Sequence, residues 1–413
     1  MKTTAIIAEY NPFHNGHQYQ IEETRRQTGA DFILIVMSGD FVQRGAPALC
    51  NKYIRTKMAL LGGADVVIEL PSLYALASAE FFAGGAVTLL NHLNVVDTLS
   101  FGSEAGNVSL FTQYAHILTS QYDFLQSRVK DFLKKGLPYP AARAKVISEI
   151  NPDFNSFSAT PNNILGLEYC KSLLATNSSI CPFTLKRQGC EYHNTSFQNI
   201  TSKYISASAV RSALSHAPKS VKKYIPDEAY QLLFENSLLT APVSENDFSM
   251  LLHYKMLMES DQGFHQYLDC SLDLSDKIRK NLSRFTSFTA FCELLKSKEI
   301  TYTRLSRVLM HILLNIRTPE YFKPPFPQRE LFVPYARLLG FKKSASPLLS
   351  AIKKSSSIPL LSKISNANFL LKDDAIDLIH QDILCASVYE SVSFHRTKKP
   401  PMNEMKQSPI IIP

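Results

Sequence analysis

The first hundred residues alternate between continuous apolar runs and segments with helical spacing. The apolar runs are typical of strands and cover residues 4–10, 32–40, 64–71 and 95–104, with a further run at 181–189. The segments between the first four space their apolar residues as helices do and cover 17–28, 50–62 and 77–93. Runs without polar alternation suit parallel strands buried on both faces. The pattern therefore predicts an α/β fold, a Rossmann-like doubly wound parallel sheet.

The rest of the chain is expected to be mainly helical. A helix-start pattern occurs in 158–174, and Ser206 or Ser208 is suited to cap a helix over 205–214. A break near 241–248 predicts two domains, residues 1–240 and residues 245–413. Residues 301–316 form an amphipathic pattern whose apolar stripe is Leu305, Val308, Leu309, Ile312 and Leu313.

Composition narrows the class of protein. The 413 residues are 45% hydrophobic and 19% charged, as in ordinary globular proteins, and no apolar run is long enough to span a membrane. Glu9 and Asn11 interrupt the N-terminal apolar run, which argues against a signal peptide. The 7 cysteines are scattered without a closely spaced pair, which favours a reducing compartment over a disulfide framework. We expect a cytoplasmic protein.

The positive charge is unevenly distributed. The net charge is +8, and residues 301–413 contain 16 Lys and Arg against 8 Asp and Glu. Such a surplus is expected of a surface that binds a polyanion, but a merely solvated basic surface explains it equally well. Charge alone does not decide between them.

The segment His14-Asn15-Gly16-His17 stands where the first predicted strand gives way to a helix. A helix N-terminus offers free N–H groups and partial positive charge, and two imidazoles add hydrogen-bond donors for phosphate oxygens. Such donors stabilise the charge that develops during displacement at phosphorus. Two alternatives remain: a structural cap, or a zinc site for which the sequence offers no obvious third ligand.

A second motif, Ile-Ser-Ala-Ser-Ala-Val-Arg, covers residues 205–211. Serines at a helix start can bind a terminal phosphate, and Arg211 one turn later can neutralise it. Serine-rich helix caps are common, so this motif is weak alone and gains weight only beside the histidine pair.

Together the two motifs resemble the HIGH-type nucleotidyltransferase superfamily, which attacks the α-phosphate of a nucleoside triphosphate and releases pyrophosphate. Longer strings, among them AEYNPFHNGH (8–17), MSGDFVQRGAPA (37–48), GADVVIELP (63–71), FGSE (101–104), PNNILGLEY (161–169) and TYTRLSRVLMHILL (301–314), are similar to the bacterial tRNA(Met) cytidine acetate ligase family. The resemblance covers nearly the whole chain. It departs mildly from the superfamily form at Ala207.

The resemblance implies an ATP-dependent ligase that activates acetate as acetyl-adenylate and acetylates the wobble cytidine of elongator tRNA(Met). It implies catalytic roles for His14 and His17, in a nucleotidyltransferase-like domain of residues 1–240. The implied ATP-binding residues are Ile7, Ala8, Glu9, Tyr10, Asn11, Pro12, Phe13, His14, Asn15, Gly16, His17, Gln18, Tyr19, Gln20, Gly102, Asn162, Arg187, Ser206, Ser208 and Arg211. Asn162, Gly102 and Arg187 also have ordinary structural explanations, as a helix cap, a turn residue and a surface charge.

Residues 245–413 are expected to form the basic, mainly helical tRNA-binding domain. Its candidate phosphate contacts are Arg304, Arg307, Lys342, Lys343, Lys353 and Lys354. ATP is the expected substrate, Mg²⁺ is considered as its accompanying ion, and no residue is assigned as a metal ligand. Two other functions stay open: adenylyl transfer to a phosphorylated metabolite, and non-catalytic RNA binding by a protein that retains a nucleotide pocket.

Overall fold

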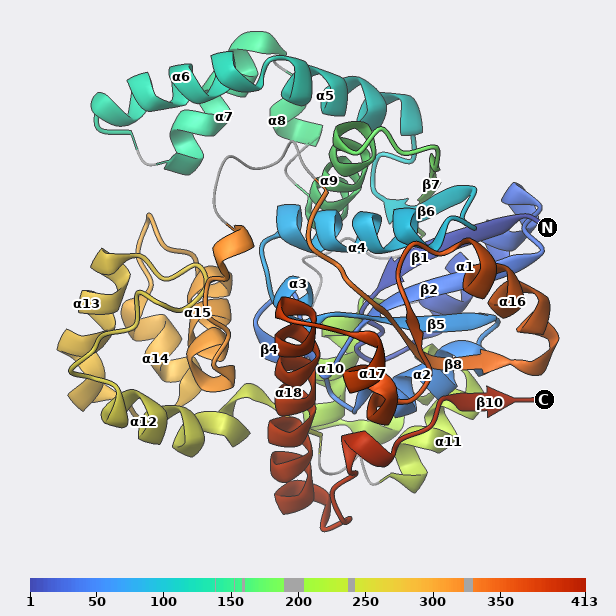
Figure 1. Ribbon diagram of the computed structural model, residues 1–413. Coiled ribbons are helices and arrows are strands. Elements are labelled where there is room, and N and C mark those ends of the chain that lie inside the picture. The colour runs from blue at the N-terminus through green and yellow to red at the C-terminus, as the bar shows by residue number, and fades with distance from the viewer. Residues whose placement is uncertain (138, 152, 158–159, 189–203, 237–241, 323–329) are drawn as a thin grey trace.

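One sheet runs through the centre of the molecule in the order β10-β8-β5-β2-β1-β6-β7, with β9 paired to β8 (Figure 1). Its strands are β1 (Thr3–Ala8), β2 (Phe32–Ser38), β5 (Val66–Leu70), β6 (Thr98–Ser103), β7 (Cys181–Lys186), β8 (Ala336–Lys342), β9 (Leu360–Leu361) and β10 (Ile410–Ile412). Strands β3 (Phe41–Val42) and β4 (Ala46–Pro47) form a separate hairpin. This computed structural model describes residues 1–413 except 138, 152, 158–159, 189–203, 237–241 and 323–329.

The five strands predicted from apolar runs are parallel neighbours in the order β5-β2-β1-β6-β7. Numbered along the chain, these strands follow the order 3-2-1-4-5 of a doubly wound Rossmann sheet, in which the chain adds strands on one side of β1 and then on the other. The predicted fold class is confirmed. In such a sheet the ligand crevice lies beyond the carboxyl ends of the strands at the reversal point, between β1 and β6.

Helices cover both faces of the sheet (Figure 1). In β2, Ile33, Ile35 and Met37 face one core, and Leu34 and Val36 face the other. The first core is covered by α1 (Asn15–Thr28), α2 (Lys52–Leu61), α10 (Ala207–His216) and α11 (Asp227–Glu235). The second is covered by α3 (Ser72–Ala75), α4 (Ala79–Leu93), α5 (Val108–Ser120) and α9 (Pro161–Ala175).

Two helical groups extend from this layered body (Figure 1). An arm beyond α5 consists of α6 (Tyr122–Lys134), α7 (Tyr139–Ile150) and α8 (Phe154–Phe157). A second group consists of α12 (Ser249–Met258), α13 (Leu272–Asn281), α14 (Phe288–Leu295) and α15 (Tyr302–Leu314). The predicted apolar stripe of α15 is buried, as its spacing required. The remaining helices are α16 (Ser346–Ser355), α17 (Ala367–Leu370) and α18 (Asp374–Thr397).

The C-terminal residues differ from the expected helical domain of 245–413. Strand β8 pairs antiparallel with β5, and β10 pairs with β8, so residues 336–413 complete the sheet of the N-terminal part. Buried charges join the same segments: Lys52 Nζ lies 2.8 Å from Glu69 and 2.5 Å from Glu404. Arg337 Nη1 lies 2.5 Å from the Glu404 carboxylate. The end of the chain thus belongs to the core around the central sheet, and the separate helical group is α12–α15.

Among the described residues, no helix combines the length and apolar character needed to cross a membrane.

Candidate active site

Two arginines fix the loop that follows β1. Arg55, fully buried on α2, donates to the carbonyl oxygens of Glu9 at 2.7 Å and Ser38 at 3.0 Å. Arg211 of α10 donates to the carbonyl oxygen of Asn11 at 2.6 Å. The Asn11 side chain in turn accepts the Leu49 N–H at 2.8 Å. Because these bonds use backbone carbonyls, they set the course of the loop and therefore the position of His14.

The hydrogen bonds at the helix start determine which ring nitrogen of each histidine carries the proton. His14 is the N-cap of α1, and its Nδ1 accepts the Gly16 N–H at 3.0 Å. The Nδ1 of His17 accepts the His14 N–H at 3.3 Å. A backbone N–H can only donate, so both Nδ1 atoms lack a proton and each neutral ring carries its proton on Nε2. The rings stack with centroids 3.7 Å apart.

Both histidines are held in the neutral form. Burial, together with the charges of Arg187 and Arg211, lowers the pKa of His14 to about 3. Burial and the neighbouring His14 lower the pKa of His17 well below its ordinary value. Near pH 7 the pair therefore offers two Nε2–H donors without bringing a formal positive charge to the site.

The two rings line a cleft beyond the carboxyl ends of β1, β6 and β7. This is the place that the strand order predicts for a ligand. Eight of the predicted nucleotide-binding residues line it: His14, Gly16, His17, Tyr19, Gln20, Gly102, Arg187 and Ser206. Gln188 and Tyr204 also line it and were not predicted. Gln188 Nε2 donates to the Tyr19 hydroxyl at 2.9 Å, and the Tyr19 and Tyr204 rings lie 5.2 Å apart.

Steric crowding explains why residue 16, between the two histidines, is a glycine. A Cβ on Gly16 would lie 2.9 Å from Cε1 of His14, because the His14 ring folds back over the helix start as its cap. At Gly102 a Cβ would meet only Cγ of Arg187, at 3.6 Å, which is an ordinary contact. Gly16 therefore serves the histidine geometry, whereas Gly102 keeps the wall of the cleft open.

Asn162 is connected to the cleft by a hydrogen bond to Glu104, a residue to which the sequence analysis assigned no role. The Asn162 amide donates to Glu104 at 2.5 Å, and the Thr160 hydroxyl donates to the same carboxylate at 2.8 Å. Arg187 Nε lies 3.8 Å from Glu104. Glu104 thus joins two predicted ATP-binding residues, Asn162 and Arg187. The sequence signals were its place directly after β6, at the ligand edge of the sheet, and its presence in the string FGSE (101–104).

The serine motif behaves as a helix start. Ser206 caps α10 by accepting the Ala209 N–H at 3.2 Å, and its hydroxyl lies 3.0 Å from that of Ser208. Ser206 lines the cleft, Ser208 contacts the Ser206 hydroxyl, and Arg211 is turned toward the loop after β1. The phosphate-binding roles of these three residues stay predictions.

Comparison with known proteins agrees with this geometry. The model of a family described as HIGH Nucleotidyl Transferase matches residues 1–404. A tRNA(Met) cytidine acetate ligase of Clostridium perfringens strain ATCC 13124 is 38% identical over 400 residues, which cover 94% of this chain and 95% of that protein. One of Clostridium novyi strain NT is 36% identical over the full length of both chains. The chain belongs to the tRNA(Met) cytidine acetate ligase family of HIGH nucleotidyltransferases.

A solved member of the family has the same architecture. The crystal structure of Thermotoga maritima TmcAL bound with alpha-thio ATP matches with a TM-score of 0.86 and 28% identity, covering 100% of this chain and 99% of that one. The apo form of the same protein matches with a TM-score of 0.88 over the full length of both chains. The C-terminal strands therefore belong to the shared fold.

In the present chain, two candidate RNA-binding arginines on α15 form ion pairs with one carboxylate. Arg304 Nε lies 3.1 Å from Asp269, and Arg307 Nη2 lies 3.3 Å from it. Arg307 is buried, and the Asp269 charge opposes the lowering of its pKa that burial causes. The pair thus ties α15 to the loop before α13, and RNA binding by either arginine stays a prediction.

The four candidate lysines lie at the opposite edge of the sheet from the histidines. Lys342 ends β8, which runs antiparallel to β5, and its N–H donates to the Asp65 carbonyl just before β5 begins. Lys343 follows it, and α16 carries Lys353 and Lys354 back toward the end of α4, where Ser355 donates to the Leu93 carbonyl. The six residues of β1 separate the two edges by roughly 20 Å.

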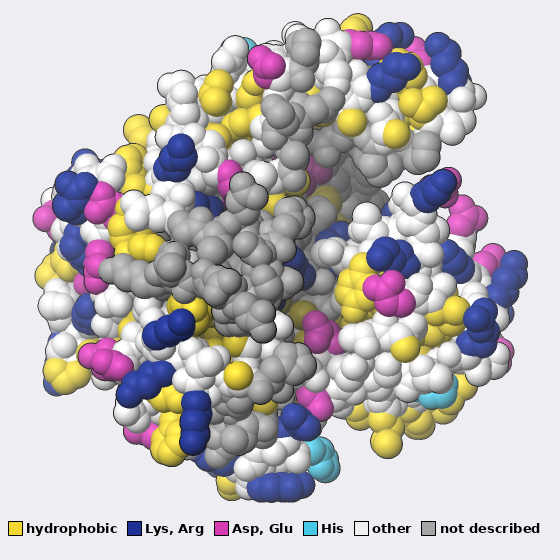
Figure 2. All heavy atoms as spheres, turned by 180° about the vertical axis from the view of Figure 1, so that it is seen from behind, with side chains coloured by type: hydrophobic (Ala, Val, Ile, Leu, Met, Phe, Trp, Pro, Cys, Tyr) yellow, Lys and Arg dark blue, Asp and Glu magenta, His cyan; other side chains and the backbone are white. Residues whose placement is uncertain are grey.

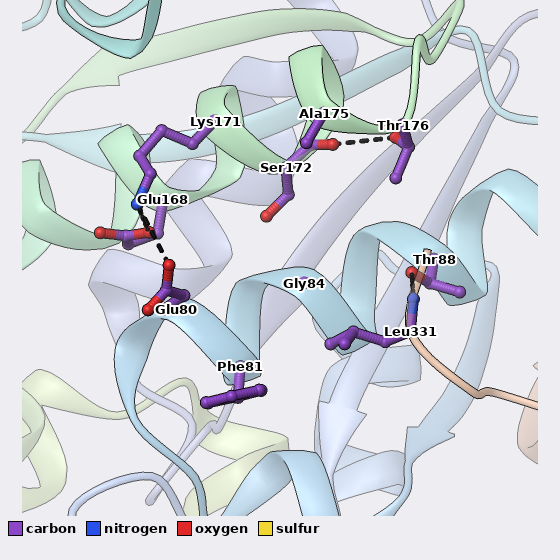
Figure 3. Close-up of a pocket in the computed structure, with 10 residues that line it drawn as sticks. All are labelled: Glu80, Phe81, Gly84, Thr88, Glu168, Lys171, Ser172, Ala175, Thr176 and Leu331. Atoms are coloured by element: carbon purple, nitrogen blue, oxygen red, sulfur yellow. Dashed lines mark hydrogen bonds and ion pairs between the residues drawn. The ribbon is translucent and has the colours of Figure 1, made fainter. Parts of the chain in front are cut away.

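A second pocket lies between α4 and α9 (Figure 3). Its charged groups satisfy one another, since Lys171 Nζ lies 2.7 Å from Glu168 and 3.5 Å from Glu80. Gly84 lets the chain pack closely there, because a Cβ would lie 2.9 Å from Leu331. This crevice is a packing feature of the helices, and its lysine, Lys171, is paired with the two carboxylates.

Metal chemistry has no obvious protein ligands here. Within the described parts of the chain, no three His, Cys, Asp or Glu side chains gather closely enough to hold a metal ion. The zinc alternative for the histidine pair also conflicts with its hydrogen bonds, since both Nδ1 atoms already accept backbone N–H groups.

Proposed function

We propose that this chain is an ATP-dependent acetate ligase that forms N4-acetylcytidine at the wobble position of elongator tRNA(Met). An acetate oxygen attacks the α-phosphorus of ATP, the bond to the bridging β-phosphate oxygen breaks, and pyrophosphate leaves. N4 of the cytidine then attacks the acetyl carbon, the bond to AMP breaks, and N4 gives up a proton. Activation is needed because a carboxylate is a poor acylating agent until its oxygen carries a good leaving group.

The neutral histidine pair is the observation that carries this proposal. Two Nε2–H donors, fixed by their Nδ1 bonds, line the cleft at the reversal point of the sheet. Donors preorganised in this way stabilise negative charge on phosphate oxygens as the α-phosphorus is attacked. Their low pKa keeps them as hydrogen-bond donors rather than proton acids near pH 7.

The remaining cleft residues bind and orient the triphosphate. Arg187 supplies a cation at one wall, and Gly102 leaves room for the nucleoside against the end of β6. Ser206 and the start of α10 offer a hydroxyl and backbone N–H groups to the terminal phosphates. The soluble, cytoplasmic setting expected from the sequence fits such an enzyme.

Incubation with ATP, labelled acetate and bacterial tRNA tests the proposal. After digestion of the RNA, we expect ATP-dependent label in N4-acetylcytidine from the anticodon of tRNA(Met). Pyrophosphate release with a phosphorylated metabolite, and no label in RNA, would instead support a small-molecule adenylyltransferase.

A further inference from the structure

A basic segment lies directly beside the histidine pair and outside the region expected to bind RNA. The 3₁₀ segment η1 (Pro218–Tyr224) carries Lys219, Lys222 and Lys223, all exposed. The Asn15 side chain donates to the Lys223 carbonyl oxygen at 3.0 Å. Because Asn15 stands between His14 and Gly16, this bond places η1 against the start of α1 at the rim of the cleft.

A further lysine lies on the rim at the end of β7. Lys186 is exposed and lines the cleft together with Arg187. We call Lys186, Lys219, Lys222 and Lys223 the rim patch. On the face seen in Figure 2, Lys and Arg side chains stand at the lower left, the side on which α11 lies once Figure 1 is turned, and also along the right edge.

The surroundings of η1 leave the ammonium groups able to bind phosphate. Lys223 Nζ lies 4.7 Å from the Tyr224 ring centroid, and Lys222 Nζ lies 5.9 Å from that of Tyr230. A ring face attracts a cation without using its hydrogen-bond donors on another charge. The exposed carboxylates of Asp227 and Glu228 follow at the start of α11 and bound the patch on that side.

We propose that the rim patch docks the phosphates of the single-stranded RNA loop that presents the reacting cytidine; this inference rests on the proposed function. The cytidine N4 must reach an acetyl group held at the α-phosphate site, so the phosphates on either side of that nucleotide must pass the cleft rim. Exposed lysines at the rim meet this requirement. Lys342, Lys343, Lys353 and Lys354, about 20 Å away across the sheet, contact at most a remote part of the RNA.

Charge reversal at two adjacent lysine pairs tests the docking surface. The test variant is Lys222→Glu with Lys223→Glu. The matched control is Lys134→Glu with Lys135→Glu, an adjacent exposed pair with the same change in net charge and no assigned role in RNA binding. Binding of an unmodified elongator tRNA(Met) transcript is measured by filter retention at several salt concentrations. Acetate-dependent ATP–pyrophosphate exchange without RNA reports the first chemical step separately.

We expect the rim variant to bind the transcript at least about tenfold more weakly, with the salt slope reduced by about 1–2, and to keep its exchange rate. The control should stay within about twofold in both assays. A rim variant with wild-type RNA affinity, whether or not the control loses affinity, would overturn the docking surface. Wild-type protein without exchange activity would instead contradict the proposed function, so the two failures are distinguishable. Lys222→Gln with Lys223→Gln repeats the test if the charge-reversed protein fails to fold.

Discussion

Arg211 Nη1 donates to the carbonyl oxygen of Asn11, 200 residues earlier in the chain, over 2.6 Å and so joins the serine motif to the loop that leads into the histidine motif. The bond links the start of α10 to the loop that positions His14. Arg211 also contributes to the lowered pKa of His14. One side chain therefore connects the proposed phosphate-binding helix with the proposed catalytic histidines.

Replacing this arginine should impair both the loop and nucleotide binding. For Arg211→Lys we expect a raised KM for ATP and a kcat lowered about 10–100-fold, because an ammonium group loses the planar donor geometry of the guanidinium. Steady-state kinetics of acetate-dependent pyrophosphate exchange measure both constants. Arg26→Lys, on the exposed part of α1, is the matched control. Unchanged values of KM and kcat in Arg211→Lys would contradict a role for this arginine in nucleotide binding.

The protonation state of the histidine pair can be observed directly. Since the pKa of His14 is lowered to about 3 and that of His17 is also lowered, neither ring should titrate between pH 5 and 8. Nitrogen-15 NMR of labelled histidine should show the Nε2–H tautomer for both. Unfolded histidines protonate near pH 6.5, so the pair should make the free energy of unfolding fall as the pH drops below that value. Titration of either ring near pH 6.5 would contradict the neutral-donor account.

Glu104 is expected to act as a positioning residue for Arg187. Glu104→Gln removes the charge that faces Arg187 and should raise the KM for ATP about 5–10-fold, with kcat changed less. Glu80→Gln, in the crevice between α4 and α9, is a control carboxylate away from the cleft. A wild-type KM in Glu104→Gln, or a matching rise in the control, would show that this carboxylate does not orient the arginine.

The C-terminal segment should contribute strongly to stability through Glu404. Burial opposes ionisation of this carboxyl, but Lys52 and Arg337 hold its pKa below the ordinary value. Glu404→Gln leaves two buried cations undercompensated and should lower the free energy of unfolding by about 3–5 kcal/mol. The stabilisation should also be lost in acid, as the pH falls below the ordinary carboxyl pKa. Urea unfolding, with the exposed Lys406→Gln as control, measures the difference, and equal stabilities would exclude this role.

The middle of the sheet was predictable because β1, β2, β5 and β6 are mostly buried and therefore carry continuous, mainly apolar runs. The positions of His14 and Gly102 followed from that sheet, since the strand order places both at the reversal point. The local sequence was sufficient to predict an element wherever burial or helix capping produces a recognisable pattern of residues.

Contacts between residues far apart in the chain produce no comparable pattern in the local sequence. Strand β8 joins the sheet beside β5, some 270 residues earlier, and β10 is only three residues long, so neither stood out in the C-terminal region. Arg304 and Arg307 are residues of the type that contacts RNA, but Asp269, from a loop earlier in the chain, forms an ion pair with both of them. Glu104 was missed because its importance depends on Asn162 and Arg187 converging on it in space.

The most direct test of the account concerns the Nε2–H donor of His14. His14→Asn keeps a side-chain acceptor suited to the N-cap of α1 but withdraws that donor. We predict a loss of about 10²–10³ in the single-turnover rate of cytidine acetylation, with tRNA affinity within about twofold and an unchanged circular dichroism spectrum. A folded His14→Asn protein that acetylates cytidine at nearly the wild-type rate would contradict the assignment of the histidine pair.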